Sequence, residues 1–368
     1  MLAKTIHSLF CFCLLLVLGC GKSGPESSSF FLADEYPEKL SDWGLIWLEG
    51  DSIKISEDST VYTLNSSLFS DYASKLRTIR LPKDQPAIYQ ERDSFVFPMG
   101  TVISKTFFYR SSDQRAVSLN NDWSGSPEDL TLDTIRLMET RLLVMQKTGW
   151  EALPYIWEGD DAYLTITGDL QELVPANTDE TFFYQIPSKN QCASCHTTNH
   201  SEGALLPIGL KARHLNHSNT DHGKNQLLYL QKNRQLAGLS NLEKVHKLAD
   251  FSDQSESLEA RARAYLDINC AHCHNQQGPA DTSALLLEYT DLDPRSYGRC
   301  KPPIATGRGS GGLLYSIVPG QAHESIMSFR LSSRDPAEMM PEIGRTLVHA
   351  EGVALINRWI NSMSGRCV

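Results

Sequence analysis

Hydrophobic and polar positions show two kinds of periodicity along the chain, with short alternating runs first and helical spacing later. Between residues 34 and 187, β-branched and aromatic residues gather at 53–55, 95–97, 106–109, 141–144, 163–167 and 182–184. Glycines at positions 100, 125, 149 and 168 separate several of these runs. Short runs bounded by turn residues are typical of strands. The pattern predicts a β-rich domain over residues 34–187, with a short helix near residues 68–77.

The second half of the chain carries the helical spacing. Apolar residues recur on one helical face over residues 257–269 and again over residues 352–360. This spacing is typical of amphipathic helices. Between the two segments, the glycine-rich stretch 307–312 predicts a loop. The expected fold class is α+β, with a β-rich region first and helices after it.

Residues 1–19 have the pattern of a lipoprotein signal peptide. Lys4 precedes an apolar run at 8–18, which is shorter than the ~20 residues of a membrane span. The run ends in Val17-Leu18-Gly19-Cys20, which resembles the lipobox in which the cysteine is lipidated. Ordinary secretory cleavage nearby is the alternative. Both predict export, and because no aspartate follows Cys20, we expect a lipid anchor in the outer membrane, on the periplasmic side. Residues 20–33 would form a flexible tether.

The composition is that of a globular protein. The chain has 368 residues, of which 41% are hydrophobic and 21% charged, which excludes disordered, collagen-like and polytopic membrane classes. A net charge of −10 argues against a nucleic-acid partner and suits a basic protein partner. The aromatic residues Trp123, Trp150, Tyr155 and Trp157 either line a ligand groove or pack in the core.

The candidate chemistry lies in a repeated motif. Apart from His7, every histidine follows residue 190, and there C-x-x-C-H occurs twice, at 192–196 and 270–274. Two thiols of such a motif add across the two vinyl groups of one haem, and the adjacent histidine becomes the proximal iron ligand. We therefore expect two covalently bound haem c groups, one held by Cys192, Cys195 and His196 and the other by Cys270, Cys273 and His274.

Two other interpretations of the paired cysteines fit their positions less well. A Cys₄ zinc site places its halves roughly 15–20 residues apart, whereas Cys192 and Cys270 are 78 residues apart. A thioredoxin-like motif expects a βαβ context and no histidine directly after it. An exported chain also meets the haem-attachment machinery, which works outside the cytoplasm. Haem attachment is therefore the favoured interpretation.

The second motif has a candidate sixth iron ligand in Met340. A helix leading into C-x-x-C-H, a later Met-Pro and a closing helix is the layout of a class I cytochrome c. A thioether opposite imidazole raises the reduction potential of the iron. Met339 is the competing ligand, and packing of both methionines is the remaining alternative.

The first motif has no comparable methionine. Its candidate sixth ligands are His200, His214, His217, His222, His246 and Met99, or another residue of the β-rich domain. A five-coordinate iron is the alternative, and an open position would permit peroxide or small-molecule chemistry. The two remaining cysteines, Cys300 and Cys367, are expected to pair in an oxidising compartment, with two free thiols as the alternative.

Seven strings of sequence carry a resemblance to a known family. They lie at 64–73, 100–107, 139–144, 150–157, 206–209, 269–274 and 340–345. Between about Tyr36 and Ile360 the chain resembles a family of bacterial di-haem c-type cytochromes that are often encoded beside a parallel β-helix repeat protein. The resemblance implies two haems and electron transfer, without an established reaction. His349 departs from the family, in which an acidic helix N-cap is common at this position.

These expectations divide the mature chain into three parts. A β-rich domain (34–187) precedes a first haem-binding segment (188–254) and a class I cytochrome c-like α-helical domain with the second haem (255–368). The expected function is electron transfer between partner redox proteins. A di-haem peroxidase- or dehydrogenase-like oxidoreductase, with the first haem as reaction centre, is the alternative. A third hypothesis makes the chain a structural subunit whose haems connect to a β-helix partner at the membrane.

Overall fold

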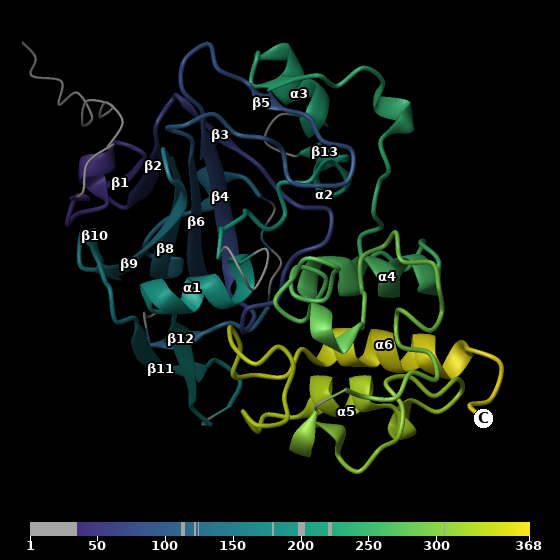
Figure 1. The fold of residues 1–368 in the computed structure, drawn as a ribbon. Helices are drawn as coiled ribbons and strands as arrows, with labels where there is room; N and C mark the ends of the chain where they lie inside the picture. The colour runs from purple at the N-terminus through teal and green to yellow at the C-terminus, as the bar shows by residue number, and fades with distance from the viewer. Residues whose placement is uncertain are drawn as a thin grey trace, which may run out of the picture.

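The computed structural model describes residues 35–111, 115–120, 123, 125–178, 180–197, 203–219, 223–304 and 306–368. Antiparallel β-sheets come first and a region of short helices follows, so the α+β prediction is confirmed (Figure 1). The predicted signal peptide, Cys20 and the tether lie outside the described residues. In the part of the chain that the structure describes, no helix has the length and apolar character needed to cross a bilayer.

The main sheet has six strands, all antiparallel, in the order β10-β9-β8-β6-β4-β3. These strands are β3 (Ser59–Val61), β4 (Ser74–Arg80), β6 (Val102–Arg110), β8 (Ile135–Gln146), β9 (Gly149–Glu158) and β10 (Asp161–Leu164). A hairpin of β1 (Ile46–Glu49) and β2 (Ser52–Ile55) and a three-stranded sheet of β7 (Ala116–Val117), β11 (Asp169–Pro175) and β12 (Phe182–Ile186) accompany it. Two small pairs complete the set: β5 (Ala87–Ile88) with β15 (Leu236–Ala237), and β13 (Ser218–Asn219) with β14 (Lys224–Asn225).

The helices follow the main sheet in the sequence. They are α1 (Lys189–His196), α2 (Ala212–Leu215), α3 (Gln226–Lys232), α4 (Leu258–Asn269), α5 (Ile326–Ser332) and α6 (Ala350–Ser362). The helices predicted over 257–269 and 352–360 are confirmed as α4 and α6. The helix predicted near residues 68–77 is wrong, because this stretch runs into β4, which pairs along its whole length with β6. The glycine-rich loop contains one short 3₁₀ turn, Gly307–Ser310.

The main sheet uses its two faces differently, since successive side chains of a strand point to opposite faces. One face packs on the β1–β2 hairpin and forms a core with Trp43, Leu76, Leu142 and Tyr155. Part of the other face packs on α2 and α3, through residues such as Ile103, Leu215 and Leu227. Of the four aromatic residues predicted to be groove or core, Trp150, Tyr155 and Trp157 are buried, whereas half-buried Trp123 packs edge-on against Phe108.

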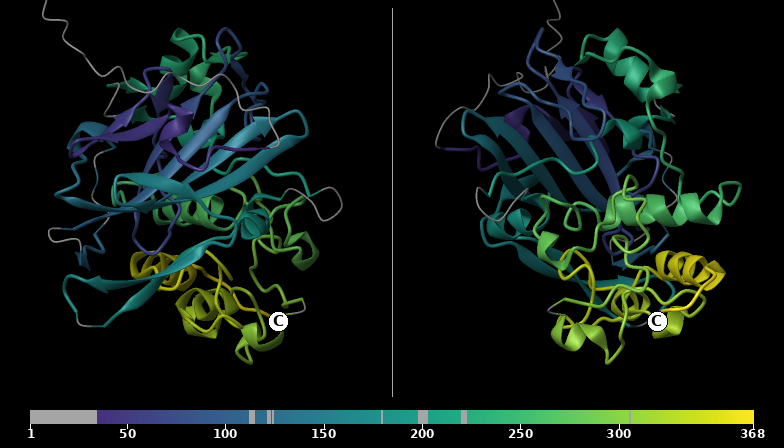
Figure 2. Two further views of the ribbon diagram at one scale, coloured as in Figure 1. Left: turned by 90° about the vertical axis from the view of Figure 1, so that its left-hand side faces the viewer. Right: turned by 45° about the vertical axis from the view of Figure 1, so that its right-hand side comes forward.

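The helical region has its own core. Tyr265 and Leu266 on α4 meet Leu355 and Trp359 on α6. The two helices approach so closely at Gly352 that an added Cβ would clash with the Tyr265 hydroxyl oxygen. A disulfide between Cys300 and Cys367 closes the same region. In the two views of Figure 2, α5 and α6 lie beyond one end of the main sheet, and α1 and α4 lie at the level where the two regions meet.

Candidate haem site

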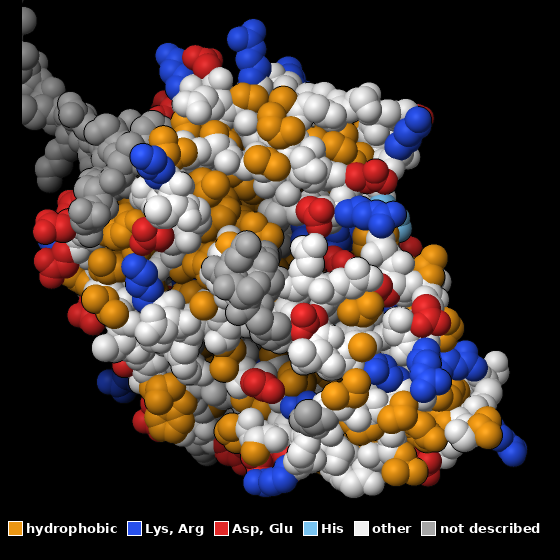
Figure 3. Space-filling view, viewed as in Figure 1, with side chains coloured by type: hydrophobic (Ala, Val, Ile, Leu, Met, Phe, Trp, Pro, Cys, Tyr) orange, Lys and Arg blue, Asp and Glu red, His pale blue; other side chains and the backbone are white. Residues whose placement is uncertain are grey.

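The two C-x-x-C-H motifs border one cleft between the main sheet and the helical region. Its walls include Cys192, Cys195 and His196 of the first motif, Cys270 and His272 of the second motif, and Met340. The cavity volume within this cleft is about 130 Å³, and the cleft is partly open to solvent. On the face shown in Figure 3, hydrophobic side chains gather over the sheet and charged ones lie mainly toward the outline.

The first motif occupies α1, a helix of two turns. Its start is a capping box, in which the Ser188 hydroxyl accepts the Gln191 N–H (3.3 Å) and the Gln191 side chain accepts the Ser188 N–H (2.9 Å). At its end, Nδ1 of His196 lies 2.7 Å from the Leu206 carbonyl oxygen. A carbonyl at Nδ1 fixes the proton there and leaves the Nε2 lone pair available, as in iron-ligating histidines.

The second motif follows directly from α4. The N-cap hydroxyl of Ser257 accepts the Ala260 N–H (3.2 Å), and Cys270 ends the helix by donating its N–H to the Leu266 carbonyl (2.9 Å). The His274 N–H then donates to the Cys270 carbonyl (2.9 Å), which curls the motif into a turn. The His274 ring places Nδ1 3.5 Å from the Ser283 hydroxyl. Burial lowers the pKa of both His196 and His274 to about 4, so both rings are neutral at neutral pH.

The motifs touch each other although they are far apart in the sequence. The Cys273 thiol lies 3.7 Å from the Ser194 carbonyl oxygen. It also hydrogen-bonds Cys195, a contact that lowers the pKa of Cys195 and raises the pKa of Cys273. All four motif cysteines are free thiols, whereas Cys300 and Cys367 are paired. Among the described residues, no three His, Cys, Asp or Glu side chains converge as they would around a metal ion.

The two candidate methionines are placed differently. Met340 lines the cleft, whereas Met339 is only 6% exposed and is not a cleft residue. The Met340 carbonyl accepts two hydrogen bonds from the guanidinium of Arg345, at 3.1 and 2.9 Å. Further along this loop, the Asp71 carboxylate accepts the N–H groups of Thr346 and Leu347, at 2.8 and 2.7 Å. Asp71 and Arg345, which the sequence patterns did not indicate, therefore hold the Met340 loop against the sheet region.

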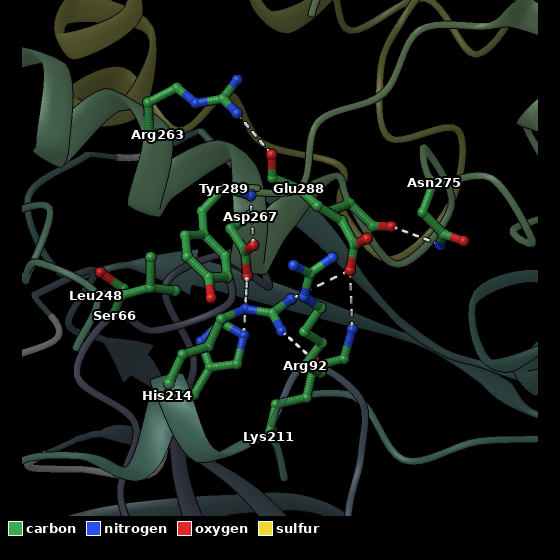
Figure 4. A network of polar contacts seen from close by, with 12 residues as sticks. Ser66, Arg92, Lys211, His214, Leu248, Arg263, Asp267, Asn275, Glu288 and Tyr289 are labelled. Atoms are coloured by element: carbon green, nitrogen blue, oxygen red, sulfur yellow. Dashed lines mark hydrogen bonds and ion pairs between the residues drawn. The ribbon is translucent and has the colours of Figure 1, made fainter. Parts of the chain in front are cut away.

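A buried network centred on Asp267 ties α4 to α2 (Figure 4). One carboxylate oxygen accepts from Arg213 (3.1 Å) and lies 2.9 Å from His214 Nε2, and the other accepts the Tyr289 N–H (2.9 Å). Burial acts to raise the pKa of Asp267, but the His214 hydrogen bond and the Arg213 charge outweigh it and hold the pKa well below its usual range. The second motif is thus fixed relative to α2.

Most candidate sixth ligands of the first motif are engaged elsewhere. His214 is held by Asp267, His217 contacts the Thr63 carbonyl (3.2 Å), and His246 stacks on Tyr289 with ring centres 4.2 Å apart. Met99 is 48% exposed. None of His214, His217, His246 and Met99 lines the cleft. The other two candidates, His200 and His222, lie outside the described residues.

The cleft floor carries three basic side chains that no sequence pattern indicated. Arg77 on β4, Lys105 on β6 and Arg141 on β8 are direct cross-strand partners, and all three line the cleft. We call these residues the basic row. Burial, together with the neighbouring charges of Arg141 and Arg77, lowers the pKa of Lys105 to about 7. A pattern of single positions on three separate strands becomes visible only once the register is known.

No protein-family model, no curated protein and no solved structure matches this chain. The functional interpretation therefore depends on the site. Four free thiols in two C-x-x-C-H turns, two imidazoles whose Nδ1 atoms face hydrogen-bond partners, and a thioether on the wall of a shared cleft form a donor set that fits two c-type haems.

Proposed function

We propose that this chain is an exported di-haem c-type cytochrome that carries electrons between partner redox proteins. The supporting observation is the contact between the two motifs, with Ser194 and Cys273 meeting across 79 sequence positions. Haems held by motifs in contact would be close neighbours. Close neighbours exchange electrons readily, which a carrier with two redox centres requires.

In this proposal each motif has a separate role. Cys270, Cys273 and His274 would hold the second haem, with Met340 as its sixth ligand. Cys192, Cys195 and His196 would hold the first haem. A thioether opposite imidazole favours Fe(II) and raises the reduction potential. The two haems would therefore differ in potential unless the first also carried a thioether.

Export and membrane anchoring belong to the same proposal. The disulfide between Cys300 and Cys367 is typical of proteins that fold outside the cytoplasm. A lipid at Cys20 would hold the chain at the periplasmic side of the outer membrane. There its partners would be a redox protein and, as the family resemblance implies, a parallel β-helix repeat protein. Palmitate labelling of the exported chain and of C20A tests the anchor.

Haem attachment is tested by pyridine haemochrome assay and intact mass of the exported protein. We expect a mass increase of two haems in the unaltered protein. C192S/C195S and C270S/C273S should each lose one haem, and the combined variant should lose both. C300S/C367S is the matched control, because it removes two cysteines outside the motifs and should keep both haems.

A mature protein with the mass of polypeptide and lipid alone, and without Soret absorption, would refute the proposal. Spin state separates the carrier from the peroxidase- or dehydrogenase-like alternative. Two low-spin haems whose spectra do not change when cyanide is added support a carrier. A high-spin haem that shifts when cyanide or peroxide is added supports an enzyme with an open iron position.

A further inference from the structure

The basic row on the cleft floor is an unusual feature of a sheet. Like charges directly opposite each other on neighbouring strands destabilise the pairing, and burying a charge adds to this cost unless a partner compensates it. Arg77, Lys105 and Arg141 occupy adjacent central strands and face a cleft. Each member therefore needs a compensating group.

The three members differ in the partners that the described residues give them. Arg141 is compensated within the sheet, because its Nε donates to the Glu139 carboxylate at 2.8 Å. Arg77 is 8% exposed and donates to the Lys75 carbonyl (3.2 Å), with no carboxylate paired to it among the described residues. Lys105 has neither a hydrogen bond nor an ion pair within the described part of the chain, and its Nζ lies 5.3 Å from the centre of the Phe107 ring. The middle member is the one without a polar partner.

The row also has a direction relative to the first motif. The charges of Arg141 and Lys105 both act on the Cys192 thiol, and that of Lys105 also acts on His196. Arg77 has Tyr62 as its neighbour instead. Neighbouring strands lie about 4.8 Å apart, so the row extends roughly 10 Å from the side of Cys192. In a haem c the propionates are on the opposite edge from the thioethers, with the iron between them.

We propose that Lys105 supplies the sixth ligand of the iron held by His196, an inference that rests on the proposed function. The Nζ lone pair would bind the iron, and the proton of the ammonium would pass to solvent. The middle of the row then matches the iron, and Arg77 at the far end is free to pair with a propionate carboxylate. Lys105 and Arg77 thereby gain the polar partners that they lack among the described residues.

Two histidines on the same cleft are less suitable. His272 lies between Cys270 and Cys273, the thiols that would join the second haem, although its buried Nδ1 has no hydrogen-bond partner among the described residues. His349 stacks on Phe69 with ring centres 4.2 Å apart, and its Nδ1 lies 3.1 Å from the Tyr265 hydroxyl. Lys105 combines a donor atom that has no polar partner among the described residues with a place on the strand between Arg77 and Arg141.

Electron paramagnetic resonance and near-infrared magnetic circular dichroism of the oxidised, exported holoprotein test this ligand. These spectra distinguish imidazole–amine from imidazole–thioether and bis-imidazole coordination. We expect one imidazole–amine and one imidazole–thioether haem. In K105A, one of the two haems should become high-spin and bind cyanide, and the other should stay unchanged. In K105M the replaced haem should gain a thioether signature and a higher reduction potential.

K75A is the matched control. Lys75 lies over the same Phe107 ring at 5.4 Å, but its Nζ donates to the Ala73 carbonyl at 2.8 Å. We expect the haem spectra of K75A to match the unaltered protein. If K105A does not fold, the spectra of the unaltered protein still decide. A bis-imidazole or high-spin first haem, or two low-spin haems in K105A, would overturn the Lys105 proposal while leaving two haems on the intact mass. Absence of haem from the intact mass would overturn the proposed function together with it.

Discussion

The first motif lies on a two-turn helix that rests against a sheet, whereas the second follows a twelve-residue helix buried among other helices. The same five-residue pattern therefore has two kinds of support. Beside the first motif is a floor of three basic side chains, and beside the second is a methionine on a braced loop. In c-type haems, axial ligands and surrounding charges set the reduction potential more than the attachment does. Two identical motifs can thus give two different redox centres.

The largest loss of stability is expected from a substitution in the buried network that joins the two regions. D267A would leave Arg213, whose side chain is 2% exposed, without its buried carboxylate partner. Breaking a buried ion pair costs about 3–5 kcal/mol, so the free energy of unfolding should fall by that amount in urea titrations of the holoprotein. Because Asp267 joins α4 to α2, both haems should respond, and Soret and far-ultraviolet signals should shift together.

D335A is the matched control for this prediction. Asp335 pairs with Arg308 at 2.8 Å, but the two side chains are 42% and 68% exposed. Exposed pairs contribute about 0–1 kcal/mol, so unfolding should barely change. Equal losses of unfolding free energy in D267A and D335A would contradict the view that the buried Asp267 network stabilises the two regions together.

The elements that were predictable are those whose periodicity is local. α4 and α6 were located from apolar spacing alone, and both motifs are contiguous in the sequence. β4 was mistaken for part of a helix because Lys75 and Arg77 do not look like strand residues. What makes the segment a strand is its pairing with β6, which lies more than twenty residues further on. Long-range pairing leaves no signal within a short window.

The same limit applies to the site. The motifs predict haem attachment at Cys195 and Cys273 from sequence alone. The contact between these two thiols could not be predicted, since it depends on how the helical region docks on the sheet. The basic row takes one residue from each of three strands. Similarly, Met340 was favoured from its neighbouring proline, whereas the arginine that braces it was invisible until the loop was folded.

The second-largest effect is a loss of stability at low pH, and it arises at the boundary between the β-rich and helical regions. His349 occupies the N-cap position of α6 without a side-chain capping bond and stacks on Phe69 of the β-rich part. Burial lowers its pKa to about 4 despite the nearby charge of Glu351. The unfolded chain, with a histidine pKa near 6.5, therefore takes up the proton first as the pH falls. Stability should drop from about pH 6.5 and level off near pH 4, by up to about 3 kcal/mol for this group.

H349F keeps an aromatic ring against Phe69 and removes the titrating group. Its unfolding free energy, measured by urea titration from pH 7 to pH 4, should vary less with pH than that of the unaltered protein. His323, whose side chain is 80% exposed, provides the control H323N, with an unchanged pH profile. A profile for H349F that parallels the unaltered protein would show that other groups control acid sensitivity.

The smallest expected loss of stability comes from removing the N-cap serine of α1 or of α4, and the same substitution at both sites compares the two helices. Ser188 caps α1 and Ser257 caps α4, each by accepting an N–H three residues ahead. Loss of an N-cap serine costs about 1 kcal/mol. In S257A this loss should appear in global unfolding, because most residues of α4 are buried. In S188A it should appear as faster amide exchange in α1, where only Cys192 is buried, with little change in global stability. Hydrogen exchange with mass spectrometry, read beside urea titrations of both variants, separates the two responses. Equal global losses would mean that α1 is as integral to the core as α4, and that the two motifs have equivalent support.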